Sequence, residues 1–227
     1  MCHPCASSTV RSATSRCCSS RSASTRFCRS DIRPVPTRRD VNPLALLADL
    51  ERRLDLWQPA TPAQARLRDD YLEYLTATGP AALDRNASRS HLTASCFVFT
   101  EDLSAVLLCF HKKGRFWVQL GGHIEAADGT VSAAAFREAT EEAGIVVTPL
   151  SPEPIDVDRH SLHAGFSKCD VHWDVGFVAI ADPALPTITS DESDDVRWWP
   201  VGALPTEVPD GFPGRVARVV AAASAVS

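Results

Sequence analysis

The chain of 227 residues lacks a run of apolar residues long enough to cross a membrane, and it lacks an excess of positive charge. A membrane-spanning helix needs about 20 mostly apolar residues in a row. Binding to a nucleic-acid backbone requires a basic surface, whereas 23 Lys and Arg stand here against 28 Asp and Glu, for a net charge of −5. These absences predict a soluble protein, which we expect in the cytoplasm, with neither a membrane nor a nucleic acid as partner.

Large apolar residues are scarce in residues 1–40, which hold nine serines and five of the eight cysteines. This segment carries eight arginines and two aspartates, a net charge of +6, so that 15 basic and 26 acidic residues give the rest of the chain a net charge of −11. Such a segment has too little apolar surface to offset the entropy lost on ordering. We therefore expect a disordered tail, the one part of the chain whose charge suits a nucleic acid.

Three interpretations of the tail stay open. It has the Arg- and Ser-rich composition of a transit peptide, and the run CHPC at residues 2–5, with cysteines 17 and 18, has residue types that bind zinc. Translation from upstream of the natural start would also explain it. Because Met1 is the only methionine, a later start then needs a non-ATG codon, for example at Val41. We favour this last interpretation or a dispensable tail.

Two amphipathic helices are predicted after the tail, over Asn42–Trp57 and Pro62–Thr78. Pro43 and Pro62 stand near their first turns, where proline is favoured, and the Gly-Pro pair at 79–80 ends the second helix. Their apolar faces are expected to pack on a sheet or to form a homodimer contact. We therefore divide the chain into the tail at 1–40, these helices at 41–80 and a main domain at 81–227.

Strands are predicted where apolar and β-branched residues dominate the main domain. They cover residues 91–100 and 105–110, separated by a polar turn, and residues 171–181. Cys96 and Cys109 fall within the first two strands, and we expect them to be small buried hydrophobes rather than reactive thiols. Alternation along a later strand separates Trp198 from Trp199, so at least one is expected in the core and the other is open to stack on a base.

The stretch REATEEAG at Arg137–Gly144 sets three glutamates on one short helix. Like charges four residues apart destabilise a helix by a few tenths of a kcal/mol, and the last turn of a helix favours cations. At 3.6 residues per turn, Glu138, Glu141 and Glu142 lie within an arc of about 100°. Such a cluster suits a hard cation such as Mg²⁺ or Mn²⁺, although a charge run by itself is more often a solvated face.

A loop with the sequence GGHIEAADGT, at Gly121–Thr130, precedes this helix. Glycines and small residues permit a tight turn and close approach of the backbone to a ligand. Thr130 or Ser132 can cap the helix, Gly144 can end it, and Ile145–Val147 begin what looks like a further strand. The predicted unit is strand, loop, helix, loop and strand, with an acidic helix face beside the first loop.

Residues Gly121–Ile145 resemble the signature box of the Nudix hydrolases, in which a glycine, five residues, an acidic residue and a spacer precede R-E-apolar-x-E-E-x-G-apolar. Asp128 stands where the pattern usually has Glu, and eight residues rather than seven separate it from Arg137. Weaker similarity extends over roughly residues 90–205. The second half of the box matches in full, at Arg137, Glu138, Ala139, Glu141, Glu142, Gly144 and Ile145.

The resemblance implies an α/β fold, a Nudix-type α/β/α sandwich with a mixed β-sheet, preceded here by the two helices and the disordered tail. It implies a hydrolase, a pyrophosphatase that cleaves a phosphoanhydride bond in a nucleoside diphosphate linked to another moiety. Such a reaction needs charge neutralisation on the phosphates and a placed water. The implied cofactor is Mg²⁺ or Mn²⁺, with Glu138, Glu141, Glu142 and the backbone carbonyl of Gly121 as metal ligands.

Further site residues follow from the same resemblance. Family members take their general base from the box helix or from a downstream loop, so Glu138, Glu142 and Glu192 are the candidates, although Glu192 also suits an ordinary turn. Arg137 is expected to orient a glutamate or Glu125 by a bidentate pair. The candidates for substrate binding are Gly122, His123 and Glu125, and His123 can instead hydrogen-bond the loop.

The substrate stays open among ADP-ribose, a dinucleoside polyphosphate, an oxidised nucleoside triphosphate and a nucleotide sugar, because the accessory patterns of NADH-cleaving and coenzyme-A-cleaving members are not found. A nucleotide sensor without turnover would typically have lost a box glutamate, and none is missing. An isoprenoid-diphosphate isomerase needs a cysteine and further metal-binding histidines, for which Cys96 and His91 are a thin basis. No role is assigned to five histidines that lack metal-ligand spacing within the predicted strands and helices, namely His91, His111, His160, His163 and His172.

Overall fold

A computed structural model of the chain describes residues 41–162, 169–191 and 193–226. The chain separates into two units, residues 1–37 and residues 38–227, and the second holds the described secondary structure. The expected tail at 1–40 lies outside the described residues, as do Glu192 and His163. Within the described ranges, no helix is both long and apolar enough to cross a membrane.

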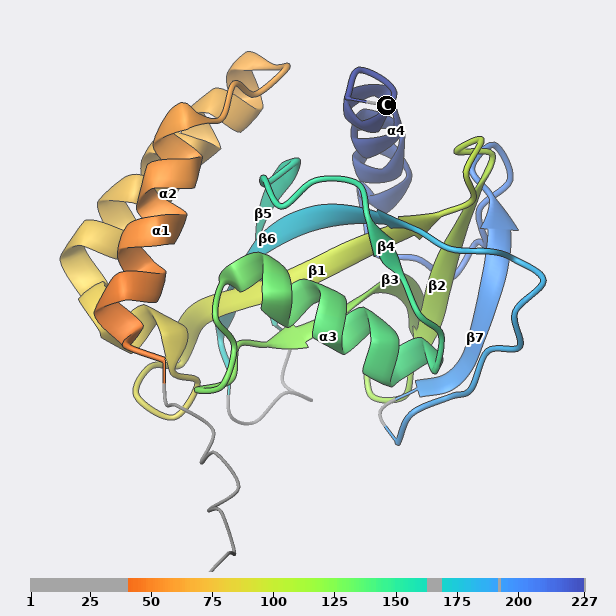
Figure 1. Cartoon of the computed structure of the whole chain (residues 1–227), viewed down its shortest axis with the longest axis horizontal. Coiled ribbons are helices and arrows are strands. Elements are labelled where there is room, and N and C mark those ends of the chain that lie inside the picture. The colour runs from red at the N-terminus through yellow and green to blue at the C-terminus, as the bar shows by residue number, and fades with distance from the viewer. Residues whose placement is uncertain (1–40, 163–168, 192, 227) are drawn as a thin grey trace, which may run out of the picture. The chain divides into compact units, whose positions relative to one another are not determined.

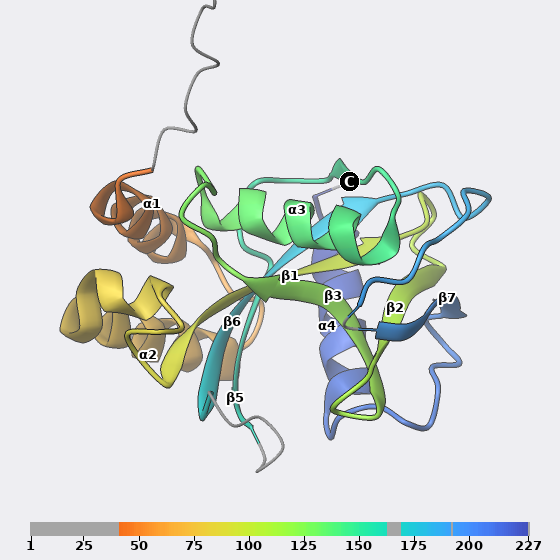
Figure 2. The ribbon, with the colours of Figure 1, turned by 90° about the horizontal axis from the view of Figure 1, so that it is seen from below.

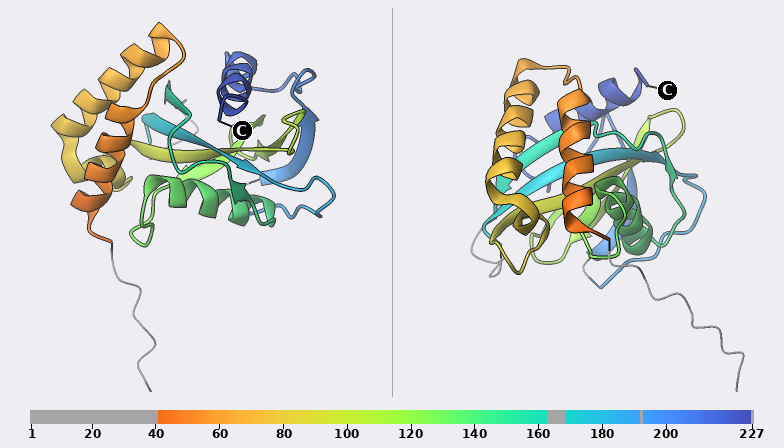
Figure 3. Two further views of the ribbon diagram at one scale, coloured as in Figure 1. Left: turned by 45° about the horizontal axis from the view of Figure 1, so that its top comes forward. Right: turned by 60° about the vertical axis from the view of Figure 1, so that its left-hand side comes forward.

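The helices α1 (Pro43–Leu56) and α2 (Pro62–Thr78) confirm the two predicted N-terminal helices. Each begins at a side-chain cap, since Asn42 accepts a hydrogen bond from the backbone N–H of Leu44 and Thr61 accepts one from Gln64. The short 3₁₀ helix η1 (Gly79–Leu83) follows. Figure 3 shows α1 and α2 side by side at one end of the sheet.

The sheet has seven strands in the order β4, β6, β1, β3, β2 and β7, with β5 also paired to β6. Strands β1 and β6 run parallel, whereas the other pairs run antiparallel, so the sheet is mixed as predicted. The strands are β1 (Ser90–Phe99), β2 (Ala105–His111), β3 (Phe116–His123), β4 (Thr148–Pro149), β5 (Asp156–Ser161), β6 (Val171–Ile180) and β7 (Ser193–Pro200).

The strand predicted to begin at Ile145–Val147 is misplaced. Strand β4 covers only Thr148–Pro149, where it pairs with the end of β6. Ile145 and Val147 are instead buried in the core on one side of the sheet, whereas Val146 is 78% exposed. Their apolar character therefore reflects packing against the helix layer rather than pairing in the sheet.

Helix α3 (Val131–Ala143) covers one face of the sheet and helix α4 (Phe212–Ala223) covers the other, which confirms the α/β/α sandwich (Figures 1 and 2). Alternation along β1 produces both cores, because Cys96 packs on the α3 side and Phe97 on the α4 side. Cys96 and Cys109 are buried, as predicted. The two tryptophans of β7, at 198 and 199, are each half-buried on opposite sides of the sheet.

The apolar faces of α1 and α2 pack into the core on the α3 side of the sheet. Leu50 and Leu54 of α1 and Tyr71 and Leu75 of α2 are buried there. Of the two expectations for these faces, the structure shows packing on the sheet, and a homodimer stays a prediction. The two helices therefore extend the main domain, and α1 forms part of one wall of the site described below.

Candidate active site

Helix α3 is held close to the sheet by small residues. Its buried face carries Ala134, Ala135, Ala139 and Ala143, whose short side chains let the helix lie near strand β3. Of the two predicted caps, Thr130 accepts the N–H of Ala133 at 3.0 Å. The helix ends at Gly144 in the left-handed conformation, with φ of +66°.

The carboxylate of Glu142 rests on the backbone of β3. Its side chain is 7% exposed, and its Oε2 accepts the backbone N–H of Gly121 at 2.8 Å. Gly121 has a φ of +153°, and a Cβ there would lie 2.6 Å from the carbonyl oxygen of Ala94. Only glycine fits between β1 and the acidic face of α3 at this position.

The carboxylate of Glu138 rests on the next residue of the same strand. A Cβ at Gly122 would lie 2.7 Å from Oε2 of Glu138, so the absence of a side chain makes room for the carboxylate. The structure thus brings two of the three predicted glutamates against the glycine pair. Glu141, one turn along the helix, is 60% exposed in its side chain.

Arg137 connects the loop to the helix through three carboxylates. Its Nε and Nη2 donate to the two oxygens of Asp128 at 3.0 and 2.9 Å, and its Nη1 donates to Glu138 at 2.9 Å and to Glu141 at 3.0 Å. The hydrogen bonds that Arg137 donates to Asp128, together with the charge of Glu138, raise the pKa of Arg137 above its ordinary value despite desolvation.

The predicted bidentate partner of Arg137 is therefore corrected. The guanidinium makes its bidentate pair with Asp128 and single hydrogen bonds with Glu138 and Glu141. The backbone N–H of Glu125 donates to the Asp128 carboxylate at 2.8 Å, and its carbonyl oxygen accepts the N–H of Asp128 at 3.0 Å. Asp128 is 6% exposed. Asp128, which stands where the motif usually has Glu, thus fixes both the loop and Arg137. Its side chain is shorter than that of Glu, and the spacer between it and Arg137 is one residue longer than usual.

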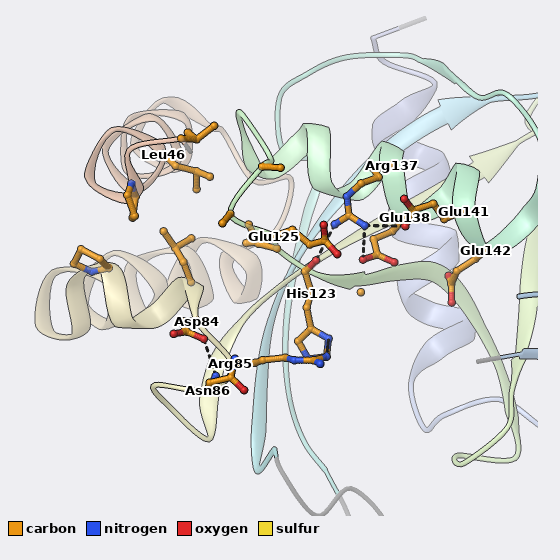
Figure 4. A pocket seen from close by; sticks show the side chains of 18 of the residues that line it. Leu46, Asp84, Arg85, Asn86, His123, Glu125, Arg137, Glu138, Glu141 and Glu142 are labelled. Atoms are coloured by element: carbon orange, nitrogen blue, oxygen red, sulfur yellow. Dashed lines mark hydrogen bonds and ion pairs between the residues drawn. The ribbon is translucent and has the colours of Figure 1, made fainter. Parts of the chain in front are cut away.

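A cavity of about 1000 Å³ lies beside this acidic face. Its walls come from α1, from η1 and the turn after it, from the loop at 122–127, from α3 and from residues 190–191 (Figure 4). Gly121 is not part of the lining, and Glu192 is not described, although its neighbours Ser190 and Asp191 line the cavity. The predicted site residues in the wall are Gly122, His123, Glu125, Arg137, Glu138, Glu141 and Glu142.

Three polar residues of the cavity wall were not predicted as site residues. Asp84, Arg85 and Asn86 follow η1, and Figure 4 shows them across the cavity from α3. Arg85 is exposed, and its Nη1 lies 3.2 Å from Nδ1 of His123. Nothing in the local sequence distinguishes these residues from an ordinary polar turn, because only the packing of η1 against the sheet places them there.

A second cluster, formed by His91, His123, His172 and Cys169, was missed by the sequence analysis. One donor atom from each of the four lies within 4.8 Å of the others. The parallel pairing of β1 with β6 puts His91 directly beside His172, and His123 lies at the end of the neighbouring strand β3. A local signal existed in the spacing Cys169-x-x-His172, which is typical of metal ligands.

The histidines of this cluster are held neutral by their surroundings. Burial, with a smaller contribution from the nearby His160, lowers the pKa of His172 to about 3. Burial also lowers the pKa of His123 to about 4, with a further contribution from the charge of Arg85. At neutral pH both rings are therefore uncharged, and each has one nitrogen with a lone pair.

A NUDIX domain matches residues 89–220, which run from the start of β1 into α4. The chain belongs to the Nudix family. Nudix hydrolases generally cleave pyrophosphate bonds and typically use divalent metal ions, and the glutamates of α3 lie within the matched region. Helix α1, which supplies part of one cavity wall, lies outside the matched region, as does α2.

Solved structures of other Nudix proteins are similar to this chain. A NUDIX-family hydrolase from Clostridium perfringens is 25% identical, with a TM-score of 0.48, over 64% of this chain and 100% of that one. An Ap4A hydrolase from C. elegans is 16% identical, with a TM-score of 0.48, over 59% and 98%. A MutT NUDIX hydrolase from Burkholderia pseudomallei is 18% identical, with a TM-score of 0.44, over 58% and 99%. A search of curated proteins finds no match.

Proposed function

We propose that this Nudix protein is a metal-dependent pyrophosphohydrolase that cleaves a phosphoanhydride bond in a nucleoside diphosphate linked to another moiety. One observation carries the proposal. The carboxylates of Glu138 and Glu142 lie against the backbone of Gly121 and Gly122 at the wall of a cavity large enough for a nucleotide. Glu138 and Glu142 on the acidic face of α3 are therefore fixed against strand β3 rather than left fully solvated.

The donor set fits a hard divalent cation. Glu138, Glu141 and Glu142 offer carboxylate oxygens on one side of α3, and Mg²⁺ and Mn²⁺ prefer oxygen ligands while retaining waters and substrate phosphates. Such a cation, when bound, neutralises phosphate charge and makes a coordinated water a better nucleophile. Gly121 can add its backbone carbonyl, as the family resemblance implies.

The residues of the chain have separable tasks in this proposal. Arg137 orients Glu138 and holds the loop at Asp128, so it acts on the glutamates rather than on the substrate. Glu138 and Glu142 are the candidates for the general base within the described site. Glu192 remains the downstream candidate, since its neighbour Asp191 lines the same cavity.

The cavity has two kinds of wall, which suits a substrate with one apolar and one charged part. Leu46 and Leu83 form an apolar side, which can cover a base or another ring. Arg85 and Asn86 supply donors on the side near His123, where phosphate or ribose oxygens can be bound. We therefore favour a nucleoside diphosphate derivative whose second moiety lies between these walls.

The test is the release of mononucleotide or phosphate from a panel containing ADP-ribose, a dinucleoside polyphosphate, an oxidised nucleoside triphosphate and a nucleotide sugar, each with Mg²⁺ and with Mn²⁺. Glu142→Gln removes one negative charge at nearly constant volume. We expect it to lower kcat by roughly 100-fold or more, the size of effect seen when a preorganised charged group is lost. Glu101→Gln, in the exposed turn between β1 and β2, is the matched control and should keep wild-type turnover.

Two other results would point elsewhere. Binding of nucleotides without turnover of any panel member, by wild-type protein, would support the sensor alternative. Isomerisation of isopentenyl diphosphate would support the isomerase alternative, although the cysteine considered for it is unsuited. Cys96 is 0% exposed, and burial raises the pKa of its thiol well above the ordinary value.

A further inference from the structure

The histidine cluster contains three buried nitrogens with no hydrogen-bond partner among the residues that the structure describes. They are the Nε2 atoms of His91, His123 and His172. The side chain of His91 is 0% exposed, and a buried polar atom without a partner costs about 1–3 kcal/mol. Three such atoms occur in one cluster, where one donor atom from each histidine and from Cys169 lies within 4.8 Å of the others. This combination indicates that a ligand normally satisfies them.

We propose that His91, His123, Cys169 and His172 bind one zinc ion in a closed site of four protein ligands, separate from the carboxylate site on α3. The set contains three imidazoles and one thiol and no carboxylate. Imidazole nitrogen and thiolate sulfur are the ligands that Zn²⁺ prefers, whereas Mg²⁺ and Mn²⁺ prefer oxygen. The ligand types of the two sites therefore favour different metals, Zn²⁺ at the histidine cluster and Mg²⁺ or Mn²⁺ at the glutamates of α3.

The fold brings the four ligands together through the sheet. His91 and His172 are direct partners in the parallel pair β1–β6, His123 ends β3 on the other side of β1, and Cys169 precedes β6 by two residues. The donor atoms lie within 4.8 Å of one another. With Zn–N of about 2.0 Å and Zn–S of about 2.3 Å, a tetrahedral site requires separations of about 3.3–3.6 Å, so the side chains close by roughly 1 Å.

His91 is already fixed in the form that binds a metal. Its Nδ1 lies 2.9 Å from the carbonyl oxygen of Ser88, which can only accept a hydrogen bond. The proton of the neutral ring is therefore on Nδ1, and the lone pair is on the buried Nε2. A second hydrogen bond of this kind is the usual device that orients a metal-bound histidine.

His123 connects the proposed zinc site with the cavity. Arg85 can only donate, so Nδ1 of His123 accepts its hydrogen bond at 3.2 Å and the ring proton is on Nε2. Coordination through Nε2 transfers the proton to Nδ1 and breaks the bond with Arg85. Because Arg85 lines the cavity and is exposed, zinc binding releases its guanidinium toward an anionic substrate.

The first experiment measures zinc in the purified full-length protein. After dialysis, we expect about one equivalent of zinc by elemental analysis, and competition with a chromophoric chelator gives the affinity. Cys169→Ser and His172→Asn, at half-exposed positions, should each weaken zinc binding by roughly 100-fold or more, because each removes one of four ligands. Circular dichroism and thermal unfolding of the zinc-free variants show whether they fold.

The control for site identity is the double variant Glu138→Gln/Glu142→Gln, which should retain zinc within about twofold if the two metal sites are separate. His111→Gln controls for loss of a histidine outside the cluster. Failure of wild-type protein to bind zinc tightly would overturn the proposal, since the histidines would then be neutral packing residues. Loss of zinc in the glutamate variant, with retention in Cys169→Ser, would assign the metal to α3 and overturn it equally.

Substitution with Co²⁺ gives a readout that does not depend on any variant. A closed site with one thiolate and three imidazoles predicts the intense visible bands of tetrahedral cobalt and a thiolate charge-transfer band in the near ultraviolet. Weak bands typical of octahedral cobalt, without the charge-transfer band, would contradict the four-ligand site. This spectrum is independent of hydrolase activity, so failure of the zinc site and failure of the proposed function are distinguishable.

Discussion

At the scale of single residues, the active-site candidate is a pairing of glycines with carboxylates. The backbone N–H of Gly121 donates a hydrogen bond to Glu142, and the absence of a side chain at Gly122 leaves room for Glu138. Arg137 then fixes Glu138 from the other side while Glu141 stays largely exposed. The three glutamates of α3 are therefore not equivalent, and two predictions follow from the difference.

We expect Glu138→Gln to impair the enzyme far more than Glu141→Gln. Glu138 is fixed by Arg137 and by the close backbone of Gly122, whereas the pair between Arg137 and Glu141 is solvent-exposed and contributes at most about 1 kcal/mol. The measurement is kcat and the Mg²⁺ concentration for half-maximal activity of both variants. Equal losses would show that preorganisation of Glu138 is unimportant.

Gly122→Ala should reduce turnover without unfolding the protein. The new Cβ would lie 2.7 Å from the carboxylate of Glu138. This side chain is flexible and can move, so the protein stays folded, but the carboxylate is then displaced from its present position. Gly129→Ala is the matched control, because, apart from its two chain neighbours, no described residue has an atom within 4 Å of a Cβ at that loop position. Comparison of kcat and melting temperature for the two variants checks the prediction, and wild-type activity of Gly122→Ala would exclude the steric argument.

At the scale of elements, helix ends and strand pairing decide where the site residues lie. Helix α3 runs from Thr130 as cap to Gly144, so the register of its glutamates is set by local signals at both ends. The end of α3 also packs against the segment between β6 and β7, because a Cβ at Gly144 would lie 2.8 Å from Cβ of Ile188 and the N–H of Ile188 donates to the carbonyl oxygen of Ala143 at 2.8 Å. The end of α3 is therefore constrained by both conformation and packing.

Two glycine-to-alanine substitutions in helices should have opposite effects on stability. Gly144→Ala forces alanine into a positive φ of 66° and into Ile188, and we expect it to destabilise the fold by about 1–2 kcal/mol. Gly214→Ala lies within α4 with no atom near the new Cβ, and it should stabilise by about 0.5 kcal/mol. Chemical denaturation of both variants measures the free energies of unfolding, and a shared sign would contradict the argument.

At the scale of the described domain, a buried ionic network joins α4 to the sheet. Arg215 donates to Asp156 at 2.6 Å and to Asp174 at 2.7 Å, and Asp174 also accepts hydrogen bonds from Thr93 and Ser95 of β1. Arg215 is 7% exposed and both aspartates are 3% exposed or less. The network couples three strands and the last helix on the side of the sheet opposite α3.

Arg215→Met should be strongly destabilising. It leaves the buried Asp174 without a guanidinium and Asp156 with Arg218 alone, and breaking a buried pair in this way costs about 3–5 kcal/mol. Arg197→Met removes an arginine of an exposed ion pair with Asp195 and should change the free energy of unfolding by at most about 1 kcal/mol. Denaturant unfolding of both variants tests the contrast, and similar small losses would show that the network is not needed for stability.

Deletion of residues 1–40 should leave a folded, active protein. Helix α1 has its own cap at Asn42, and the backbone N–H of Val41 donates to Ala126 of the site loop at 3.2 Å, so both remain after this cut. Deletion of residues 1–57 removes α1 with part of one wall of the cavity and with Leu50 and Leu54 of the core. We expect this longer deletion to unfold the domain, as melting curves and turnover of both truncations will show.

The sequence by itself determined the elements whose signals are local. Caps, prolines and glycines marked α1, α2 and α3, and the spacing of the box residues placed three glutamates on one helix face, because helical geometry depends only on nearby residues. The same spacing supported the Nudix assignment, which the NUDIX domain match over residues 89–220 then established. Burial of Cys96 was predicted from its residue type and its place in an apolar strand.

Only the tertiary structure decided which distant residues meet. The parallel pairing of β1 with β6 joins segments about 80 positions apart, and it alone places His91 beside His172 and Asp174 beside Thr93. The misplaced strand at Ile145–Val147 has the same origin, since burial under a helix layer and burial in a sheet select the same apolar residues. Long-range pairing is decided by the combined packing of two sheet faces, and no short stretch of sequence carries that information.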